Sequence, residues 1–562
     1  MKHLACLVLS LLALPVFAAT PLQLPSPLPP LRIPQAAHPQ PRPPAGVPVL
    51  VWTPQLINSL NLSSTVTRDL LAHLVSSVPV VGSANHSATA TQTTPIVRDG
   101  ISPASTTGLH RRAIPMATAL GTSPAVSDSS QDIEPSIITN RFGGVDRTTT
   151  VFTKFVSGDI PFHYWTSTTD YVNYAGWPSG YQLPLPPNTT RSSDPLLSEN
   201  PYAYSGAFPG RTYCVGISYD VAQLPTVHPT HSALTVWYTD NPGAGQNAWN
   251  TTVVEQDDNP IFYDKPSIAT SWNWNTLGYT YVATLIIHLD TGYHDIQVYR
   301  QGATTGFTLV NRQFLYMPVG VTSPILTVDS ATGDVYLLWL DTTNNVIQIA
   351  RSTDMGNTFG APVTVGAESL VSANNGSICD WQHLNCVRAA SVIMARTNDA
   401  DHSVGVVWHL REIDGTHTDA GFNQFRFASQ SWRWWRGIQI GHPGANDQRD
   451  QWNPALDPSS DGSYMLTWYD KRDDPNNNLY RVYSTRVNAD GTAIDPTDTL
   501  IYNAAAGADL SQLPQIPPPP QAGIRYMGEY QDIWEWYGTW YGSTTYIAPN
   551  GNQDIYITRT AP

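Results

Sequence analysis

The sequence predicts an all-β protein built from a repeated four-stranded unit. A proline that follows a polar or charged residue and precedes small or apolar residues recurs along the chain. These prolines are Pro135, Pro195, Pro266, Pro324 and Pro454. Between them lie short segments with alternating apolar and polar residues, many aromatics and Gly, Asn or Asp turns, which is the pattern of strands rather than helices. The unit length is therefore about 60 to 70 residues.

The units share two further strand endings. A predicted second strand ends in an acid at Asp240, Asp341 and Asp470. A predicted third strand ends in arginine, at Arg300, Arg351, Arg486 and Arg559. Four antiparallel strands per unit, repeated many times, predict the blades of a β-propeller.

The number of units follows from the spacing. The interval from Pro324 to Pro454 is almost two units long, so a further unit is expected to open near residue 389, at Arg388-Ala-Ala-Ser-Val-Ile. One more step reaches Arg525-Tyr-Met-Gly-Glu-Tyr. We therefore predict seven blades, with six as the alternative because the last unit is the least regular. That unit stops after its third strand, so we expect a strand from upstream of Asp132 to complete it.

The N-terminal part reads differently from the repeats. Lys2 and His3 precede an apolar run from Leu4 to Val16, and small residues follow, which predicts a signal peptide over residues 1–19 and export of the protein. Residues 20–50 are a proline-rich spacer. Residues 51–130 have low complexity with one helix expected over 64–77, and 131–562 form the propeller. No apolar run approaches the roughly 20 residues of a membrane span.

Composition narrows the partners. The chain holds 29 Lys and Arg against 44 Asp and Glu, a net charge of −15, and no basic runs. This excludes nucleic acid and anionic membrane surfaces as favoured partners. The 18 tryptophans and 27 tyrosines suit either sugar stacking or sheet packing. Two groups, Trp432/Trp434/Trp435 and Trp534/Trp536/Trp540, could be sugar platforms, although we favour packing.

Three cysteines remain after the leader. An exported protein permits disulfides, and the spacing of Cys379 and Cys386 suits a small loop bridge. Cys214 lies in a strand-like segment and is expected to be a buried thiol. We predict no metal site and no cofactor. Oxygen ligands at Asp470, Asp473, Asp474 and Asn476 could hold calcium, but they lack the glycine and final glutamate of an EF-hand loop, so a solvated turn is favoured.

One turn carries a recognisable motif, Ser352-Thr-Asp354-Met-Gly356-Asn-Thr358-Phe359. It resembles the Asp-box, S-x-D-x-G-x-T-[FW], of the bacterial sialidase-like propellers with BNR repeats. Asp354 is expected to accept hydrogen bonds from amides of the turn, Gly356 to relieve the backbone, and Phe359 to begin the fourth strand with a buried ring. The motif builds a blade turn and implies the fold rather than an activity.

The resemblance implies a sialidase-type site, with an arginine triad for the substrate carboxylate, a Tyr–Glu nucleophile pair and an aspartate acid/base. Arg32-Ile33-Pro34 has the letters of the first arginine motif but lies in the proline-rich segment, and the repeats lack that motif. Residues at the starts of the inner strands should meet at one rim. The catalytic candidates there are Arg388, Arg525, Glu134, Asp194, Asp264, Tyr526 and Glu529, with Lys265, Asn453 and Tyr530 beside them.

Two functions follow from this ring. The first is a secreted exo-glycosidase of the sialidase type, in which arginines bind an acidic sugar and a carboxylic acid protonates the leaving group. The second is a non-catalytic propeller, secreted, periplasmic or at the cell surface, that binds glycans or proteins. In the second case the ring residues close blade turns and form salt bridges.

Overall fold

The computed structural model describes residues 122–126 and, with gaps, residues 131–560. The longer gaps are 170–179, 201–210, 223–227, 272–277, 302–305, 368–376, 380–385, 389–391, 412–417, 427–430, 433–437, 441–448, 489–497, 503–507 and 510–523. The predicted signal peptide, proline-rich spacer and helix 64–77 lie outside the described residues. Among the described residues no helix is long and apolar enough to cross a membrane.

The described chain is all-β, and most of its strands pair antiparallel with their neighbours in the sequence. Three of these sheets have four strands. They are β6 (Arg191–Asn200), β7 (Arg211–Ala222), β8 (His228–Thr239) and β9 (Asn250–Asp258); β10 (Ile261–Thr270), β11 (Thr280–His288), β12 (Tyr293–Gln301) and β13 (Phe307–Pro318); and β14 (Val321–Val328), β15 (Val335–Asp341), β16 (Val346–Ser352) and β17 (Val363–Ala367). A short 3-10 turn, η2 (Pro242–Ala244), follows β8.

Two further sheets have a short fifth strand beside the third one. They are β20 (Met394–Asn398), β21 (Ser403–Arg411), β22 (Thr418–Arg426), β23 (Ser431–Trp432) and β24 (Ile438–Ile440); and β25 (Gln451–Pro458), β26 (Tyr464–Asp470), β27 (Leu479–Val487), β28 (Thr499–Tyr502) and β29 (Ala508–Asp509).

An eight-stranded sheet joins the two ends of the described chain. Its strands are β2 (Gln131–Phe142), β3 (Val145–Val156), β4 (Ile160–Thr168) and β5 (Tyr181–Gln182), then β31 (Asp532–Trp536), β32 (Thr539–Ile547), β33 (Gln553–Thr560) and β1 (Thr122–Val126). The two halves meet at one parallel bridge, Gln131 to Gln553. β1 pairs with β33, so the expected strand from upstream of Asp132 does lie beside the last unit.

The recurring prolines lie inside the first strands of the sheets, not at their beginnings. The pairing register is interrupted there in β2, β6, β10, β14 and β25, each time across the residue before the proline and the proline itself. The residue before the proline has positive φ in all five, at Glu134 (56°), Asp194 (62°), Lys265 (44°), Ser323 (51°) and Asn453 (45°). A β-bulge tolerates proline because the bulged residues leave the hydrogen-bonded ladder.

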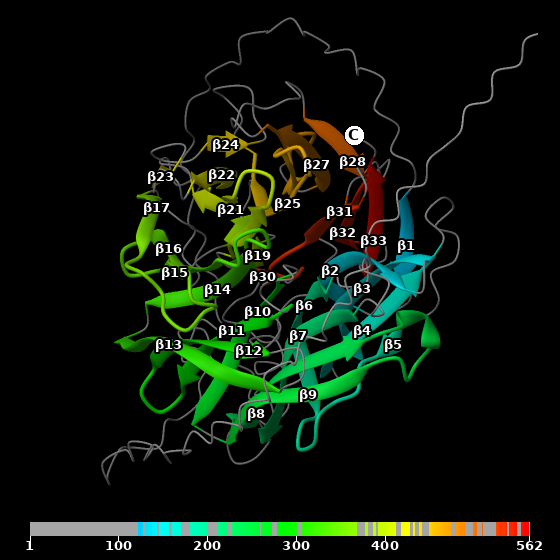
Figure 1. The fold of residues 1–562 in the computed structure, drawn as a ribbon. Helices are drawn as coiled ribbons and strands as arrows, with labels where there is room; N and C mark the ends of the chain where they lie inside the picture. The colour runs from blue at the N-terminus through cyan, green and yellow to red at the C-terminus, as the bar shows by residue number, and fades with distance from the viewer. Residues whose placement is uncertain are drawn as a thin grey trace, which may run out of the picture. The chain divides into compact units, whose positions relative to one another are not determined.

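The first strands, by which we mean β2, β6, β10, β14, β20, β25 and β31, lie next to one another. All of them except β20 are labelled in Figure 1. Each contacts the first strand of the following group, and β31 contacts β2. Their apolar side chains join those of the second and third strands in buried clusters, which include Trp237, Trp468 and Tyr281. Cys214 is a buried free thiol, as predicted.

Three strand assignments differ from the sequence prediction. The segment ending at Asp240 is the third strand of its sheet, β8, because β6 and β7 precede it. Arg388 and Arg525 do not begin first strands. They lie in a separate small sheet of β18 (Ser377–Cys379), β19 (Cys386–Arg388) and β30 (Ile524–Arg525), and the first strands that follow them are β20 and β31. The small sheet thus precedes β20 and β31, the two first strands that lack the regular x-Pro bulge.

Candidate functional site

The bulges gather charged side chains from distant parts of the sequence. Lys265 Nζ, in β10, lies 3.4 Å from Glu529 Oε2, just before β31, and both side chains are buried. Tyr530 donates a hydrogen bond of 2.9 Å to the carbonyl of Pro195. Asn453 donates one of 3.3 Å to the carbonyl of Gly528. We call Glu134, Asp194, Asp264, Lys265, Glu529 and Tyr530 the bulge cluster.

Asp194 is an acid of the bulge cluster with a strongly shifted pKa. Burial and the nearby carboxyls of Glu134, Asp264 and Glu529 raise its pKa well above the usual value, and Lys265 opposes this only in part. Neither carboxyl oxygen of Asp194 has a hydrogen-bond partner among the described residues. Burial therefore favours the neutral acid. The adjoining cavity of about 30 Å³ has room for about one water molecule.

The structure thus brings together four of the predicted ring acids, Glu134, Asp194, Asp264 and Glu529, but as a closed cluster rather than an open rim. Arg388 and Arg525 are described only as backbone. Their strands pair in parallel, with Val387 opposite Arg525. Tyr526 lies outside the described residues. The catalytic role of this ring stays a prediction.

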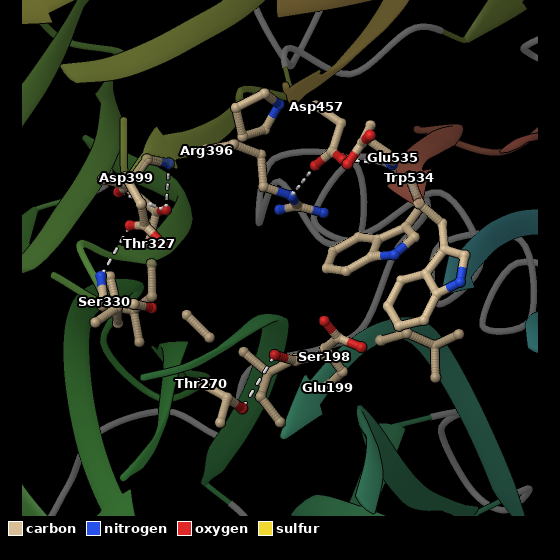
Figure 2. Close-up of a pocket in the computed structure, with 18 of the residues that line it drawn as sticks. Ser198, Glu199, Thr270, Thr327, Ser330, Arg396, Asp399, Asp457, Trp534 and Glu535 are labelled. Atoms are coloured by element: carbon tan, nitrogen blue, oxygen red, sulfur yellow. Dashed lines mark hydrogen bonds and ion pairs between the residues drawn. The ribbon is translucent and has the colours of Figure 1, made fainter. Parts of the chain in front are cut away.

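A larger cavity opens at the other end of the first strands. Its volume is about 780 Å³. The walls come from the last residues of β6, β10, β14, β20, β25 and β31 and from the turns after them. The polar and aromatic lining residues are Ser198, Glu199, Thr270, Thr327, Ser330, Arg396, Thr397, Asp399, Asp457, Ser460, Trp534, Glu535 and Trp536. Figure 2 shows Arg396, Glu199 and Trp534 directed toward the same open space.

Two carboxyl groups that line this cavity, which we call the axial cavity, have pKa values shifted upward. Burial, and then the charge of Asp457, raise the pKa of Glu199 well above its usual value. Glu199 Oε2 is enclosed and has no hydrogen-bond partner among the described residues. Burial also raises the pKa of Asp457, although Arg396 and the amide of Glu535 pull it down. Glu199 is partly exposed, so it can reach a molecule in the cavity.

Arg396 is held between two acids. Its Nη2 lies 3.3 Å from Asp532 Oδ1, and its Nε lies 3.7 Å from Asp457 Oδ1. Asp457 Oδ2 in turn accepts a hydrogen bond of 2.6 Å from the amide of Glu535. These contacts fix the guanidinium against β25 and β31 and leave its charge largely compensated.

Trp534 and Trp536 supply the aromatic part of the lining. They are two residues apart in β31, so they lie on one face of the strand. Trp534 is partly exposed, whereas Trp540, the third member of the predicted group, is fully buried. The group therefore divides between lining and packing. Of the other predicted group, β23 ends at Trp432 and the remaining tryptophans lie outside the described residues.

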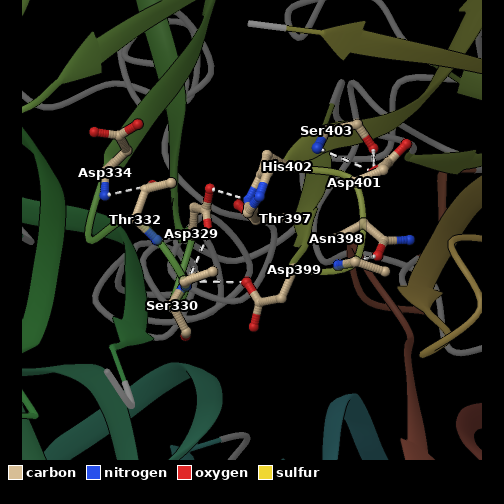
Figure 3. Close-up of polar contacts among 12 residues, drawn as sticks. Asp329, Ser330, Thr332, Asp334, Thr397, Asn398, Asp399, Asp401, His402 and Ser403 are labelled. Atoms are coloured by element: carbon tan, nitrogen blue, oxygen red, sulfur yellow. Dashed lines mark hydrogen bonds and ion pairs between the residues drawn. The ribbon is translucent and has the colours of Figure 1, made fainter. Parts of the chain in front are cut away.

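The rim beside β14 and β20 is tied by hydrogen bonds between neighbouring sheets (Figure 3). Thr327 and Thr397 share a hydroxyl contact of 2.8 Å. Asp399 accepts a hydrogen bond of 2.9 Å from the amide of Ser330. One turn further out, His402 Nδ1 lies 2.9 Å from Asp329 Oδ2. Three links across one sheet boundary hold this wall of the cavity in place.

The Asp-box forms the expected turn. Asp354 Oδ1 accepts 2.8 Å and 2.7 Å hydrogen bonds from the Thr358 amide and the Ser352 hydroxyl, and Gly356 has a φ of 82°. Burial would raise the pKa of Asp354, but these bonds outweigh it and hold the pKa below its usual value. Phe359 packs partly buried against the core, but it precedes β17 rather than beginning it. The turn lies outside the cavity lining.

Two other predicted features are the Cys379–Cys386 bridge and the acidic turn considered for calcium. Cys379 and Cys386 lie directly opposite each other in the register of β18 and β19, while their side chains are not described, so the disulfide stays a prediction. In the acidic turn, Asp470 is bound to Arg472, Asp473 to Arg481, and Asp474 to the amide of Asn476. Protein donors thus contact carboxyl oxygens of three of the four residues considered for calcium. Among the described side chains no group of three or more could hold a metal ion.

The sequence analysis missed Glu199, Arg396 and Asp457. A signal for two of them exists, because Glu199 and Asp457 follow the recurring prolines Pro195 and Pro454 by four and three residues. Counting along an alternating strand from the bulge would have located the strand ends. Arg396 has no such marker, because β20 lacks the x-Pro bulge.

Comparison with known proteins gives only distant likenesses. No protein-family model matches the sequence. No curated protein matches it either. A sialidase from Trypanosoma rangeli in complex with the inhibitor DANA aligns at 8% identity with a TM-score of 0.36, covering 76% of this chain and 55% of that one.

Two other solved structures are similar at the same level. A Hadza microbial sialidase aligns at 10% identity and a TM-score of 0.38, over 60% of this chain and 63% of that one. The GH43 endo-arabinanase from Bacillus licheniformis aligns at 13% identity and a TM-score of 0.31, over 66% and 98%. The chain thus spans less than two thirds of either sialidase. These values assign neither a family nor an activity. The class of the protein, all-β with several four-stranded sheets, rests on its own structure.

Proposed function

We propose that this protein is an exported seven-bladed β-propeller that binds a glycan in the axial cavity. The single observation that carries the proposal is Trp534, a partly exposed tryptophan that lines a cavity of about 780 Å³ together with acids and hydroxyls. Seven first strands in mutual contact support the blade count, and the predicted leader supports export.

The lining matches the chemistry of a sugar. A pyranose ring has an apolar face that stacks on an indole and a rim of hydroxyls that exchange hydrogen bonds. Ser198, Thr270 and Thr327 offer hydroxyls, and Glu199 offers a carboxyl oxygen. The volume lies within the roughly 300–1,000 Å³ of small-molecule sites, enough for a short oligosaccharide.

The test is calorimetric titration of the full chain with neutral, anionic and cationic oligosaccharides. Trp534→Ala is expected to weaken binding about tenfold or more, because the stacking surface is lost. Tyr293→Ala is the matched control, since Tyr293 is an exposed aromatic in β12 and does not line the cavity. Unchanged affinity in Trp534→Ala, or no binding of any sugar, would remove the proposal.

Hydrolysis is a second candidate function, favoured by the carboxyl of Glu199. A partly exposed acid whose pKa is raised by burial is suited to protonate a leaving group. Turnover is measured with 4-methylumbelliferyl glycosides, sialic acid included. Loss of turnover with retained binding in Glu199→Gln supports catalysis in the cavity. Loss in Arg388→Ala and Arg525→Ala instead supports the predicted ring. Binding without turnover in every glycoside leaves a non-catalytic glycan-binding propeller.

A further inference from the structure

Charge is distributed unevenly over the cavity wall. Four described lining residues are acids from four different segments: Glu199, Asp399, Asp457 and Glu535. Among the described lining residues Arg396 is the one cation. The wall therefore carries more potential negative charge than positive, and this imbalance lies around a space large enough for a ligand rather than in a packed core.

The positive charge of Arg396 already lies beside the carboxyl groups of two neighbouring acids. Besides Asp532 and Asp457, it contacts the carbonyl of Ala395, 3.4 Å from Nη1. A carboxylate ligand is gripped best by a guanidinium that offers two free N–H groups side by side. An acidic sugar in this cavity would have to compete with two buried acids for Arg396 and would also lie near Glu199. The wall thus disfavours an anionic ligand.

The carboxyl group of Glu199 favours a cationic ligand. Its Oε2 is enclosed without a hydrogen-bond partner among the described residues, and the neighbouring charge that acts on its pKa is the negative charge of Asp457. A ligand ammonium group would supply the missing donor and the missing charge at once. The cost of ionising a carboxyl in this place falls when an opposite charge binds beside it.

We propose that the cavity selects a positively charged amino sugar, such as a glucosamine oligosaccharide, over neutral and acidic sugars. The inference rests on the proposed glycan-binding function and assigns its ligand class. The stacking surface of Trp534 holds the ring, and Glu199, with Asp457 and Asp399, recognises the ammonium group. Because burial raises the pKa of Glu199, we expect the bound ammonium group to shift this carboxyl toward the carboxylate, with release of a proton to solvent while the ammonium remains charged.

The test uses three ligands on the full chain at about pH 6, where an amino sugar is cationic. They are a glucosamine tetramer, its N-acetylated counterpart, which has the same backbone without charge, and 3′-sialyllactose. The glucosamine tetramer is expected to bind about tenfold tighter than the N-acetylated one, and sialyllactose to bind weakest. High salt should reduce the advantage of the amino sugar several-fold, because part of the attraction is screened.

Variants assign the preference to residues. Glu199→Gln is expected to reduce the affinity for the glucosamine tetramer by a much larger factor than the affinity for the N-acetylated tetramer, so that most of the preference for the charged sugar is lost. Asp399→Asn, at the rim, should act in the same direction with a smaller effect. Glu255→Gln is the control, because Glu255 is an exposed acid in β9 outside the lining. Should Glu199→Gln fail to fold, Asp399→Asn still decides the question.

Proton release gives a second readout. Titrations in two buffers of different ionisation enthalpy count the protons exchanged on binding, and release is expected in the wild type and not in Glu199→Gln. Equal affinity for charged and neutral tetramers, tightest binding of sialyllactose, or absence of proton release would overturn the inference while leaving glycan binding intact. Failure of every sugar to bind would instead overturn the proposed function itself.

Discussion

The two ends of the first strands place acids in opposite surroundings. At one end the x-Pro bulges turn Glu134, Asp194 and Lys265 into a buried cluster with room for about one water. At the other end the same strands finish beside a cavity of about 780 Å³. Both ends raise the pKa of a carboxyl, Asp194 in one case and Glu199 in the other.

Burial of an acid does not by itself decide whether that acid belongs to a binding site. In the bulge cluster the acids face one another and Lys265, so their interactions are internal and serve to join sheets that are far apart in sequence. In the cavity Glu199 and Trp534 face open space, so an outside molecule can complete their contacts. A perturbed acid indicates a binding site only where the structure also leaves room for a partner.

The largest effect on stability is expected from Lys265→Met. It leaves Glu529 buried without its cation, and loss of one partner of a buried pair costs about 3 kcal/mol or more of the free energy of unfolding. Denaturant unfolding at pH 7 measures this. The double variant with Glu529→Gln should recover most of the loss. A change below about 0.5 kcal/mol would show that the bulge cluster does not join the sheets.

Arg396→Met makes the matching change at the open end. Asp457 and Asp532 lose their cation, but water in the cavity can solvate part of the charge, so the expected loss is smaller, about 2 kcal/mol. The same denaturant measurement applies. A loss greater than that of Lys265→Met would mean that the cavity end, and not the bulge end, holds the sheets together.

Gly528→Ala tests the backbone of the bulge cluster. Gly528 has a φ of 89°, and a Cβ there would lie 2.9 Å from the amide nitrogen of Glu134. We expect a loss of about 1 to 2 kcal/mol in the free energy of unfolding. Gly306→Ala is the control, because nothing lies within 4 Å of a Cβ at that position. Equal stability of the two variants would contradict a tight bulge end.

Asp194→Asn should give the smallest effect, and it depends on pH. The folded-state pKa of Asp194 is raised, so between the unfolded value of about 3.9 and the folded value the native state holds more protons than the unfolded state. This contribution to stability is present below the unfolded pKa and is lost as pH rises through the folded pKa. Asparagine removes that dependence.

We therefore expect Asp194→Asn to be more stable than the wild type at pH 8, by about 1 kcal/mol, with a smaller difference near pH 4. Melting temperatures over this pH range measure it. His163 provides the opposite slope for comparison, because burial lowers its pKa to about 3, and the native state is therefore disfavoured as pH falls below about 6.5. A parallel pH profile for wild type and Asp194→Asn would show that Asp194 is ionised in the folded protein.

The bulge cluster could be predicted from the sequence because it depends on a local rule. A residue before proline, repeated at the same point of each unit, must leave the ladder in each unit, and repetition brings those residues together. The sequence pattern named Asp194 and Glu134 as residues that open inner strands, and the structure places both at bulges inside those strands. Arg388 and Arg525 were misplaced as strand openings because the rule was extended to units that have no x-Pro bulge.

The all-β class, the repeat, the Asp-box turn and the importance of the residues before the recurring prolines follow from the sequence alone, because each of these rests on contacts within a few residues or on regular repetition. The tertiary structure is needed to show that the bulge end of the first strands is closed and that the other end opens into a cavity. That depends on how side chains from segments as distant as Glu199, Arg396 and Trp534 fill the space between neighbouring sheets, and local pattern does not encode the volume that remains.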